Sequence, residues 1–214
     1  RRLAFLLLML APLWLSGCVT FERAPAPLSC DAQLVGRWVP LLDTAEGNAS
    51  LTPDDYVLVD PQCKASLSRS KASDRSALTT ELDARGFTLE GQSYLALADS
   101  DVSRLFTRSL PDGQQPPAML KDRQPTQAVV LARYRIEGDI FSLAMIDFET
   151  VATLVNKKRL VANTTDQFNY TFTGDDAYLR KVLRDHPELF KEETDKPMRL
   201  KRAPLEPAPL EPTP

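Results

Sequence analysis

The chain has 214 residues, and its 26 lysines and arginines against 29 aspartates and glutamates give a formal charge of -3. A mildly acidic chain lacks the clustered positive charge that proteins use to neutralise nucleic-acid phosphates, so we expect no nucleic-acid partner. Its 8 glycines and modest aromatic content also exclude a fibrous repeat or a wholly disordered chain, and the length suffices for a domain with a buried core.

The N-terminal segment has the pattern of a secretory signal peptide. Two arginines, Arg1 and Arg2, precede an apolar run at 3–15, and small residues follow before Cys18. The run is shorter than the roughly 20 apolar residues that span a bilayer. We therefore predict that residues 1–17 are removed, which takes away two arginines and moves the formal charge from -3 to -5.

The last four residues of this segment, Leu15-Ser16-Gly17-Cys18, resemble the lipobox of bacterial lipoproteins. The resemblance implies a diacylglycerol on the Cys18 thiol, cleavage just before it, and an acyl chain such as palmitate on its amine. Each buried methylene contributes about 0.8 kcal/mol, so several chains hold a protein at a membrane. In such lipoproteins Asp after the cysteine signals inner-membrane retention. Val19 therefore indicates a periplasm-facing outer-membrane protein, with the inner membrane as the alternative.

A short tether is expected after the lipidated cysteine. Residues 18–29 contain Ala-Pro-Ala-Pro, which favours extended polyproline geometry. Such a segment predicts about 30 Å of distance between the membrane and the domain, at roughly 3 Å per residue.

The two other cysteines, Cys30 and Cys63, are expected to form a disulfide. A lipoprotein domain folds in an oxidising compartment, where two remaining thiols usually pair. The alternative is two buried thiols. A metal site is disfavoured, because no CxxC spacing and no histidine cluster accompany these cysteines.

The expected domain opens with a segment that carries Gly36-Arg37-Trp38 and ends at Pro40. This triplet resembles the G-x-W signature of lipocalins. That resemblance implies an eight-stranded barrel whose closed end holds the tryptophan under an arginine from a late strand. Arg199 or Arg202 could supply that arginine. A Gly-x-Trp triplet in another kind of β domain is the alternative.

The middle of the chain reads as a series of short strands. Alternating or β-branched runs bounded by turn residues predict strands at 56–59, 63–68, 78–89 and 89–97. The third run is interrupted at Arg85-Gly86, and Glu90-Gly91 predicts a hairpin turn.

The clearest fold signal lies at 127–148, where two apolar runs flank the hairpin signature Glu137-Gly138-Asp139. The second run, Ile140 to Phe148, is apolar on both faces, so the strand must be covered on both sides. We expect the following helix, at about Asp175 to Phe190, to provide the cover. Pro187 should break or kink that helix.

The remaining elements are short. A helix is expected at Phe148–Leu154 and a last strand at Met198–Lys201, and the Pro-Leu-Glu-Pro repeats of residues 203–214 predict a disordered or polyproline tail.

Together these elements predict a mainly β fold for residues 30–202: an antiparallel up-and-down sheet or a lipocalin-like barrel with a C-terminal amphipathic helix. The order of a G-x-W opening, an Arg-Tyr-x-x-x-Gly-Asp hairpin and a late helix resembles small bacterial outer-membrane lipoproteins with a lipocalin-like β domain. That resemblance implies the fold and no assigned activity.

No catalytic constellation stands out. The single histidine, His186, lies on the apolar stripe of the expected helix, where a structural role is usual. The Ser-x-x-Lys spacing at Ser68–Lys71 lacks the S-D-N and K-T-G motifs that accompany it in penicillin-recognising enzymes. We therefore expect a protein that is not an enzyme and holds no metal or cofactor.

Two functions remain open. In the first, the β domain binds a small hydrophobic ligand near four inward-facing residues, Tyr94, Tyr134, Phe141 and Met145. In the second, the core is filled and the surface serves a structural or protein-interaction role in the cell envelope. The sequence does not decide between them, because small barrels are either filled or hollow.

Overall fold

The computed structural model describes residues 18–42, 50–51, 56–69, 78–108, 127–166, 169–190 and 198–204. The expected signal-peptide segment, residues 205–214 of the expected tail and Lys71 lie outside this part of the chain. The described part is mainly β. It divides into two compact units. Of the described residues, unit 1 comprises 18–27, 98–108, 127–132, 145–166 and 169–190, and unit 2 comprises 28–42, 50–51, 56–69, 78–97, 133–144 and 198–204.

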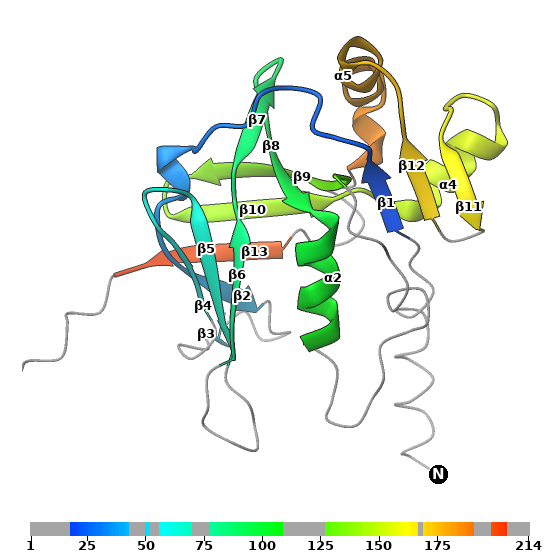
Figure 1. The fold of residues 1–214 in the computed structure, drawn as a ribbon. Coiled ribbons are helices and arrows are strands. Elements are labelled where there is room, and N and C mark those ends of the chain that lie inside the picture. The colour runs from blue at the N-terminus through cyan, green and yellow to red at the C-terminus, as the bar shows by residue number, and fades with distance from the viewer. Residues whose placement is uncertain are drawn as a thin grey trace, which may run out of the picture. The chain divides into compact units, whose positions relative to one another are not determined.

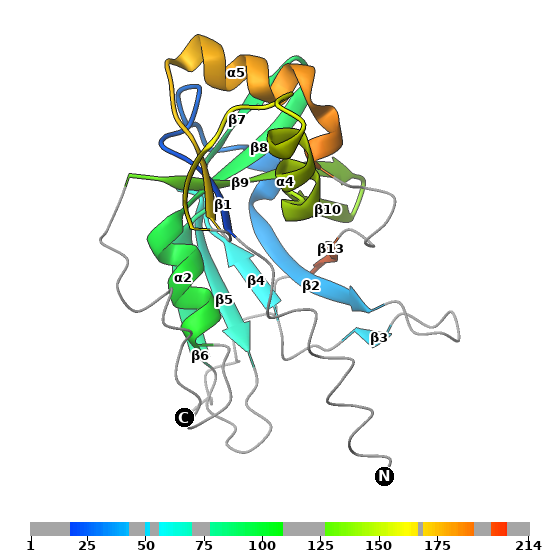
Figure 2. The same cartoon turned by 90° about the vertical axis from the view of Figure 1, so that its right-hand side faces the viewer.

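Unit 2 is a largely antiparallel sheet preceded by the short 3-10 helix η2 (Ala32–Leu34). Its strands follow the spatial order β6-β5-β4-β2-β13-β10-β9-β8-β7, with β3 on the edge of β2 (Figures 1 and 2). Pairing is antiparallel from β10 through β13, β2, β4 and β5 to β6, and again between β7 and β8. The strands are β2 (Gly36–Leu42), β3 (Ser50–Leu51), β4 (Tyr56–Val59), β5 (Lys64–Arg69), β6 (Leu78–Asp83), β7 (Gly86–Leu89), β8 (Gln92–Ala98), β10 (Ile140–Met145), β13 (Met198–Ala203) and the later half of β9 (Val129–Glu137).

The sheet of unit 2 is not closed by strand pairing. Among the described residues no ladder joins β6 to β7, the two ends of the strand order. Only Ala84 and Arg85 separate these two strands in the chain. The interruption expected at Arg85-Gly86 is therefore real, and the closed barrel expected from the lipocalin resemblance is not present as a continuous ladder.

Both predicted hairpin turns are present, and each contains the expected glycine. Gly91 joins β7 to β8 with a φ of 79°, and Gly138 joins β9 to β10 with a φ of 58°. A positive φ at the turn suits glycine, because the absence of a Cβ removes the steric penalty.

Unit 1 combines a small sheet with helices. The sheet has the order β11-β12-β1-β9, in which β1 (Cys18–Phe21) runs parallel to β12 (Asn169–Phe172). The fourth strand, β11 (Asn163–Asp166), pairs antiparallel with β12. The helices are α2 (Asp99–Arg108), α4 (Phe148–Asn156), α5 (Asp176–Asp185) and the 3-10 helix η3 (Pro187–Leu189). The fully buried side chains of this unit include Phe21, Leu131, Val151, Phe172, Leu179 and Leu189.

Helix boundaries follow capping chemistry. Asp175 accepts a hydrogen bond from the Tyr178 amide at 2.8 Å and caps α5, which ends before Pro187. Asp147 caps α4 by accepting from the Thr150 amide at 3.3 Å. The strand expected to continue to Phe148 therefore stops at Met145, because Asp147 starts a helix there. The helix α5 is followed by η3 and β13, so it is not the last element of the chain.

The expected tether is wrong for its first residues. Val19, Thr20 and Phe21 are 6%, 4% and 0% exposed, since β1 lies between β12 and β9. The β-branched and aromatic residues of Val-Thr-Phe favour a strand. The Ala-Pro-Ala-Pro segment that follows led to the prediction of an extended tether for these residues as well. Pro25 is buried as well.

Candidate functional site

The Gly36-x-Trp38 motif of unit 2 contacts an arginine from the last strand. The guanidinium of Arg202 lies 4.2 Å from the centre of the Trp38 ring, and the two residues are directly paired across β2 and β13. Arg202 also donates hydrogen bonds to the carbonyl oxygens of Val35 and Gln33, at 2.7 and 2.6 Å. Of the two arginines named from the sequence, Arg202 is the one over the tryptophan, and Arg199 is exposed.

Glycine at position 36 leaves room for this arginine. Gly36 has a φ of 136°, and a Cβ there would lie 2.8 Å from Nη1 of Arg202. The indole nitrogen of Trp38 donates to the Leu34 carbonyl at 2.7 Å, which ties the ring to η2. The glycine and the tryptophan of the motif are thus both explained by their contacts with Arg202 and η2.

A second set of contacts completes this end of unit 2. The Tyr134 hydroxyl donates to Asp31 Oδ2 at 2.8 Å, and burial together with this bond raises the pKa of the phenol. The predicted disulfide between Cys30 and Cys63 is confirmed, with a Cα–Cα distance of 5.5 Å. It holds the residue before Asp31 against the turn between β4 and β5.

The four predicted ligand-binding residues do not form one site. The rings of Tyr134 and Phe141 stack with their centres 5.8 Å apart, and the centres of the Phe141 and Trp38 rings are 5.6 Å apart. These three rings therefore fill one region of the core. Tyr94 is buried against Phe87, at 5.2 Å.

Tyr94 points away from that region. The neighbour of Tyr94, Ser93, hydrogen-bonds Tyr134, so Tyr94 points to the opposite face of β8. Burial raises the pKa of Tyr94. Met145 belongs to unit 1 and is 44% exposed.

A group of aliphatic side chains was missed by sequence reasoning. We define the Trp38 face as the side of the unit 2 sheet toward which Trp38 points; directly paired residues, and residues two apart, share a face. By strand register this face includes buried Phe141 and Leu200.

Other apolar members of the Trp38 face keep solvent exposure, among them one residue each on β2, β4, β5, β10 and β13. Met198 is 59% exposed and the other four are half-buried. We call this set the aliphatic group: Pro40, Val57, Leu67, Leu143 and Met198. Period-two alternation places each of them on a strand face, but only the pairing register shows that the faces are the same.

Cys18, the predicted lipidation residue, is the first residue of β1. It is half-buried, and its Sγ lies 3.9 Å from Oδ1 of buried Asp99. The side chain therefore retains a route to solvent while the residues that follow it are packed.

The described residues offer no metal cluster: no group of three or more His, Cys, Asp or Glu side chains is placed to hold an ion in this part of the chain. His186 is bonded to Glu188 through Nδ1, at 3.1 Å, at the end of α5. It serves there in a local contact between neighbouring residues.

Comparison with known proteins adds no relationship. No protein-family model, no curated protein and no solved structure matches this chain. Within the residues that the structure describes, no helix is long and apolar enough to cross a membrane.

Proposed function

We propose that this protein is a lipid-anchored, periplasm-facing lipoprotein of the outer membrane whose lipocalin-like β domain binds a small hydrophobic ligand without catalysis. The anchor would be a diacylglycerol on Cys18 with an acyl chain such as palmitate on its amine. Support for the anchor comes from the sequence 1–18, where charge, hydrophobic length and the lipobox-like tetrad agree. Val19 after the cysteine favours the outer membrane.

The barrel part of the proposal rests on the segment Leu78–Leu89. Its first half, β6, pairs with β5, and its second half, β7, pairs with β8. A single bent strand that pairs with different neighbours along its length would join the two ends of the sheet. Counting β6 and β7 as that one strand, the order is that of an up-and-down barrel in which β13 returns to β2. Arg202 over Trp38 fits the lipocalin resemblance of the Gly-x-Trp motif.

The observation that supports ligand binding is the solvent exposure of the aliphatic group. Apolar side chains that share a face with the core would ordinarily be buried, and each square ångström that a ligand covers contributes about 25 cal/mol before the cost of association. An acyl chain or similar apolar molecule fits such a surface, because the group consists of hydrocarbon side chains and one thioether. A lipid anchor would keep the site close to lipids and their breakdown products.

A different observation favours the second candidate function. Trp38, Tyr134 and Phe141 are in contact and buried, so part of the interior is occupied by the protein's own rings. If the rest is occupied too, the protein acts through its surface, as a structural or protein-interaction lipoprotein of the envelope.

Ligand binding is tested with two neighbouring residues on β4. Val57 belongs to the aliphatic group, whereas Leu58 points to the opposite face and is 37% exposed. A soluble form lacking residues 1–17 and carrying Cys18→Ser is titrated with a fluorescent fatty acid, and native mass spectrometry checks for co-purified lipid. We expect saturable binding that Val57→Arg removes and Leu58→Arg leaves. Absence of both saturable binding and co-purified lipid would contradict ligand binding and favour the second candidate function, a structural or protein-interaction role.

A further inference from the structure

No spacer separates Cys18 from the buried core of unit 1. Cys18 pairs with Asn169 as the first residue of β1, and the very next side chain, Val19, is 6% exposed. The parallel ladder continues to Phe21 opposite Phe172, and Phe21 also pairs with Val129. The chain thus enters the core within one residue of the predicted lipid attachment point.

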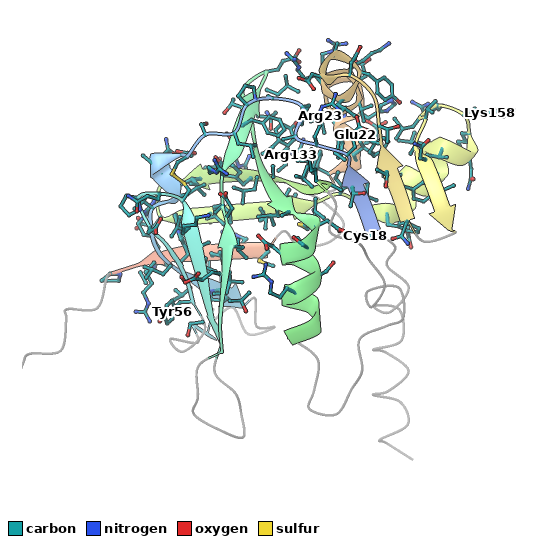
Figure 3. All side chains as sticks on the ribbon, in the orientation of Figure 1. Cys18, Glu22, Arg23, Tyr56, Arg133 and Lys158 are labelled. Atoms are coloured by element: carbon teal, nitrogen blue, oxygen red, sulfur yellow. A yellow bond between two sulfur atoms is a disulfide. The ribbon has the colours of Figure 1, made fainter. Side chains whose placement is uncertain are left out.

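Contacts beyond the strand hold β1 in place. The Glu22 amide donates to the Phe172 carbonyl at 2.9 Å. Arg23 donates to the Gly174 carbonyl at 2.8 Å and to Asp176 Oδ1 at 3.0 Å, at the start of α5 (Figure 3). Pro25 is buried after them. A strand fixed at its far end does not lengthen into a tether without losing these bonds and exposing Phe21.

The unit 1 sheet therefore has two distinguishable ends. Cys18 and Asn169 form one end, which we call the Cys18 end. Asn163 pairs with Thr171 toward the other end and donates from its amide to Thr173 Oγ1 at 3.0 Å.

The loop with Lys157, Lys158 and Arg159 precedes β11 and belongs to the end away from Cys18. It is held near α5 by a 2.9 Å hydrogen bond from the Tyr178 hydroxyl to the Val161 carbonyl. Figure 3 shows Cys18 and Lys158 at opposite ends of the unit 1 sheet. The basic loop is thus directed away from the anchor.

We infer that the Cys18 end of unit 1 rests directly on the lipid headgroup layer of the membrane that carries the protein. This inference rests on the proposed lipidation of Cys18. The acyl chains would hold the Cys18 backbone at headgroup level, and consecutive Cα atoms are about 3.8 Å apart. The buried strand therefore begins at the membrane surface, whereas a free polyproline tether would have kept the unit some 30 Å away.

Two exposed positions make a matched pair for the test. Ser100 follows Asp99, the residue in contact with Cys18, and Lys158 lies at the opposite end. Ser100→Cys and Lys158→Cys are made separately in the full chain, produced in bacteria and extracted from membranes. Because Cys30 and Cys63 are paired and Cys18 is acylated, the new thiol alone takes a fluorophore. The protein is placed in phosphatidylethanolamine and phosphatidylglycerol vesicles with brominated chains, which quench nearby fluorophores.

We expect several-fold stronger quenching at position 100 than at position 158. A flexible Gly-Ser insert of about 12 residues after Cys18 should abolish the difference, because its ends lie about 20 Å apart on average. Asn169→Cys provides a second position at the Cys18 end and should behave like position 100.

The outcomes separate the two proposals. A mass spectrum that shows acylated Cys18 together with equal quenching at positions 100 and 158 would overturn the direct contact and leave the anchor standing. A mass spectrum without acylation would remove the anchor, and the contact with it. Acylation with unequal quenching that the insert abolishes supports both.

Discussion

The guanidinium of Arg202, on the last strand of unit 2, covers the ring of Trp38, on the first strand, at 4.2 Å. Arg202 joins the end of the unit 2 sheet to its beginning through one cation–π contact and two hydrogen bonds. One hydrogen bond goes to the carbonyl of Gln33 in η2, and the other goes to the carbonyl of Val35 just after η2. Because β2 and β13 are far apart in the chain, this contact should stabilise the whole of unit 2.

Replacing Arg202 by alanine should lower the free energy of unfolding by about 2–4 kcal/mol, from the lost cation–π contact and two charge-assisted hydrogen bonds. Denaturant unfolding measures the change. Lysine at 202 should restore part of it, since a cation over the ring returns without the fork of donors. Arg199→Ala, on the exposed face of the same strand, is the control and should change stability little. Equal effects at 199 and 202 would contradict the assignment.

Gly36→Ala should destabilise the protein by about 2 kcal/mol or more, because alanine is strained at a φ of 136° and its Cβ meets Arg202. Gly91→Ala is the matched control: φ is 79° there, but no atom lies within 4 Å of the added Cβ. It should cost only about 1 kcal/mol, since the conformational part alone remains. Thermal melts of both variants compare them. The explanation fails if Gly91→Ala is the more damaging change.

Removing the disulfide by the double replacement Cys30→Ser and Cys63→Ser should lower stability by about 3–4 kcal/mol. The bond closes a loop of sequence separation 33, and an entropy model of the unfolded chain yields this size. Melting temperatures with and without reductant check it, because the double variant should not respond to reductant. A wild-type protein whose melting temperature also ignores complete reduction would contradict the prediction.

Stability should fall in alkaline solution partly through Tyr134. Burial and the bond to Asp31 raise the pKa of the phenol in the folded state. The unfolded chain releases this proton near the ordinary value of about 10, so the stabilisation is complete below that pH and decreases as pH rises above it. Tyr134→Phe should flatten the alkaline part of the unfolding curve, although it costs about 1 kcal/mol at neutral pH through the lost hydrogen bond. An unchanged alkaline slope in this variant would refute the role of Tyr134.

Cys18→Ala should release the protein from the outer membrane if Cys18 carries the lipid. Without acyl chains the protein would lose the hydrocarbon burial that the proposed anchor supplies. Membrane fractionation followed by mass spectrometry of the N-terminal peptide measures this, with the disulfide double variant as a control for loss of folding. Retention of Cys18→Ala in the membrane fraction would be evidence against the anchor.

Local patterns in the sequence predicted the elements whose cause is local. The turns at Gly91 and Gly138 follow from backbone freedom at glycine, and the cap of α5 at Asp175 and its end before Pro187 follow from hydrogen-bonding capacity within one turn. The disulfide could also be predicted, because only two cysteines remained once Cys18 was assigned to the lipid.

Tertiary structure alone decided which surfaces meet. Nothing local distinguishes Arg202 from Arg199; the register of β13 against β2 places the former opposite Trp38. The registers of β10, β13, β2, β4 and β5 together assemble the aliphatic group. The hydrogen bond between Ser93 and Tyr134 shows that Tyr94 points away from Tyr134. Val19 to Phe21 became a buried strand because β12, distant in the chain, supplies its partner. Contacts between residues far apart in sequence depend on pairing and packing, which a local pattern does not encode.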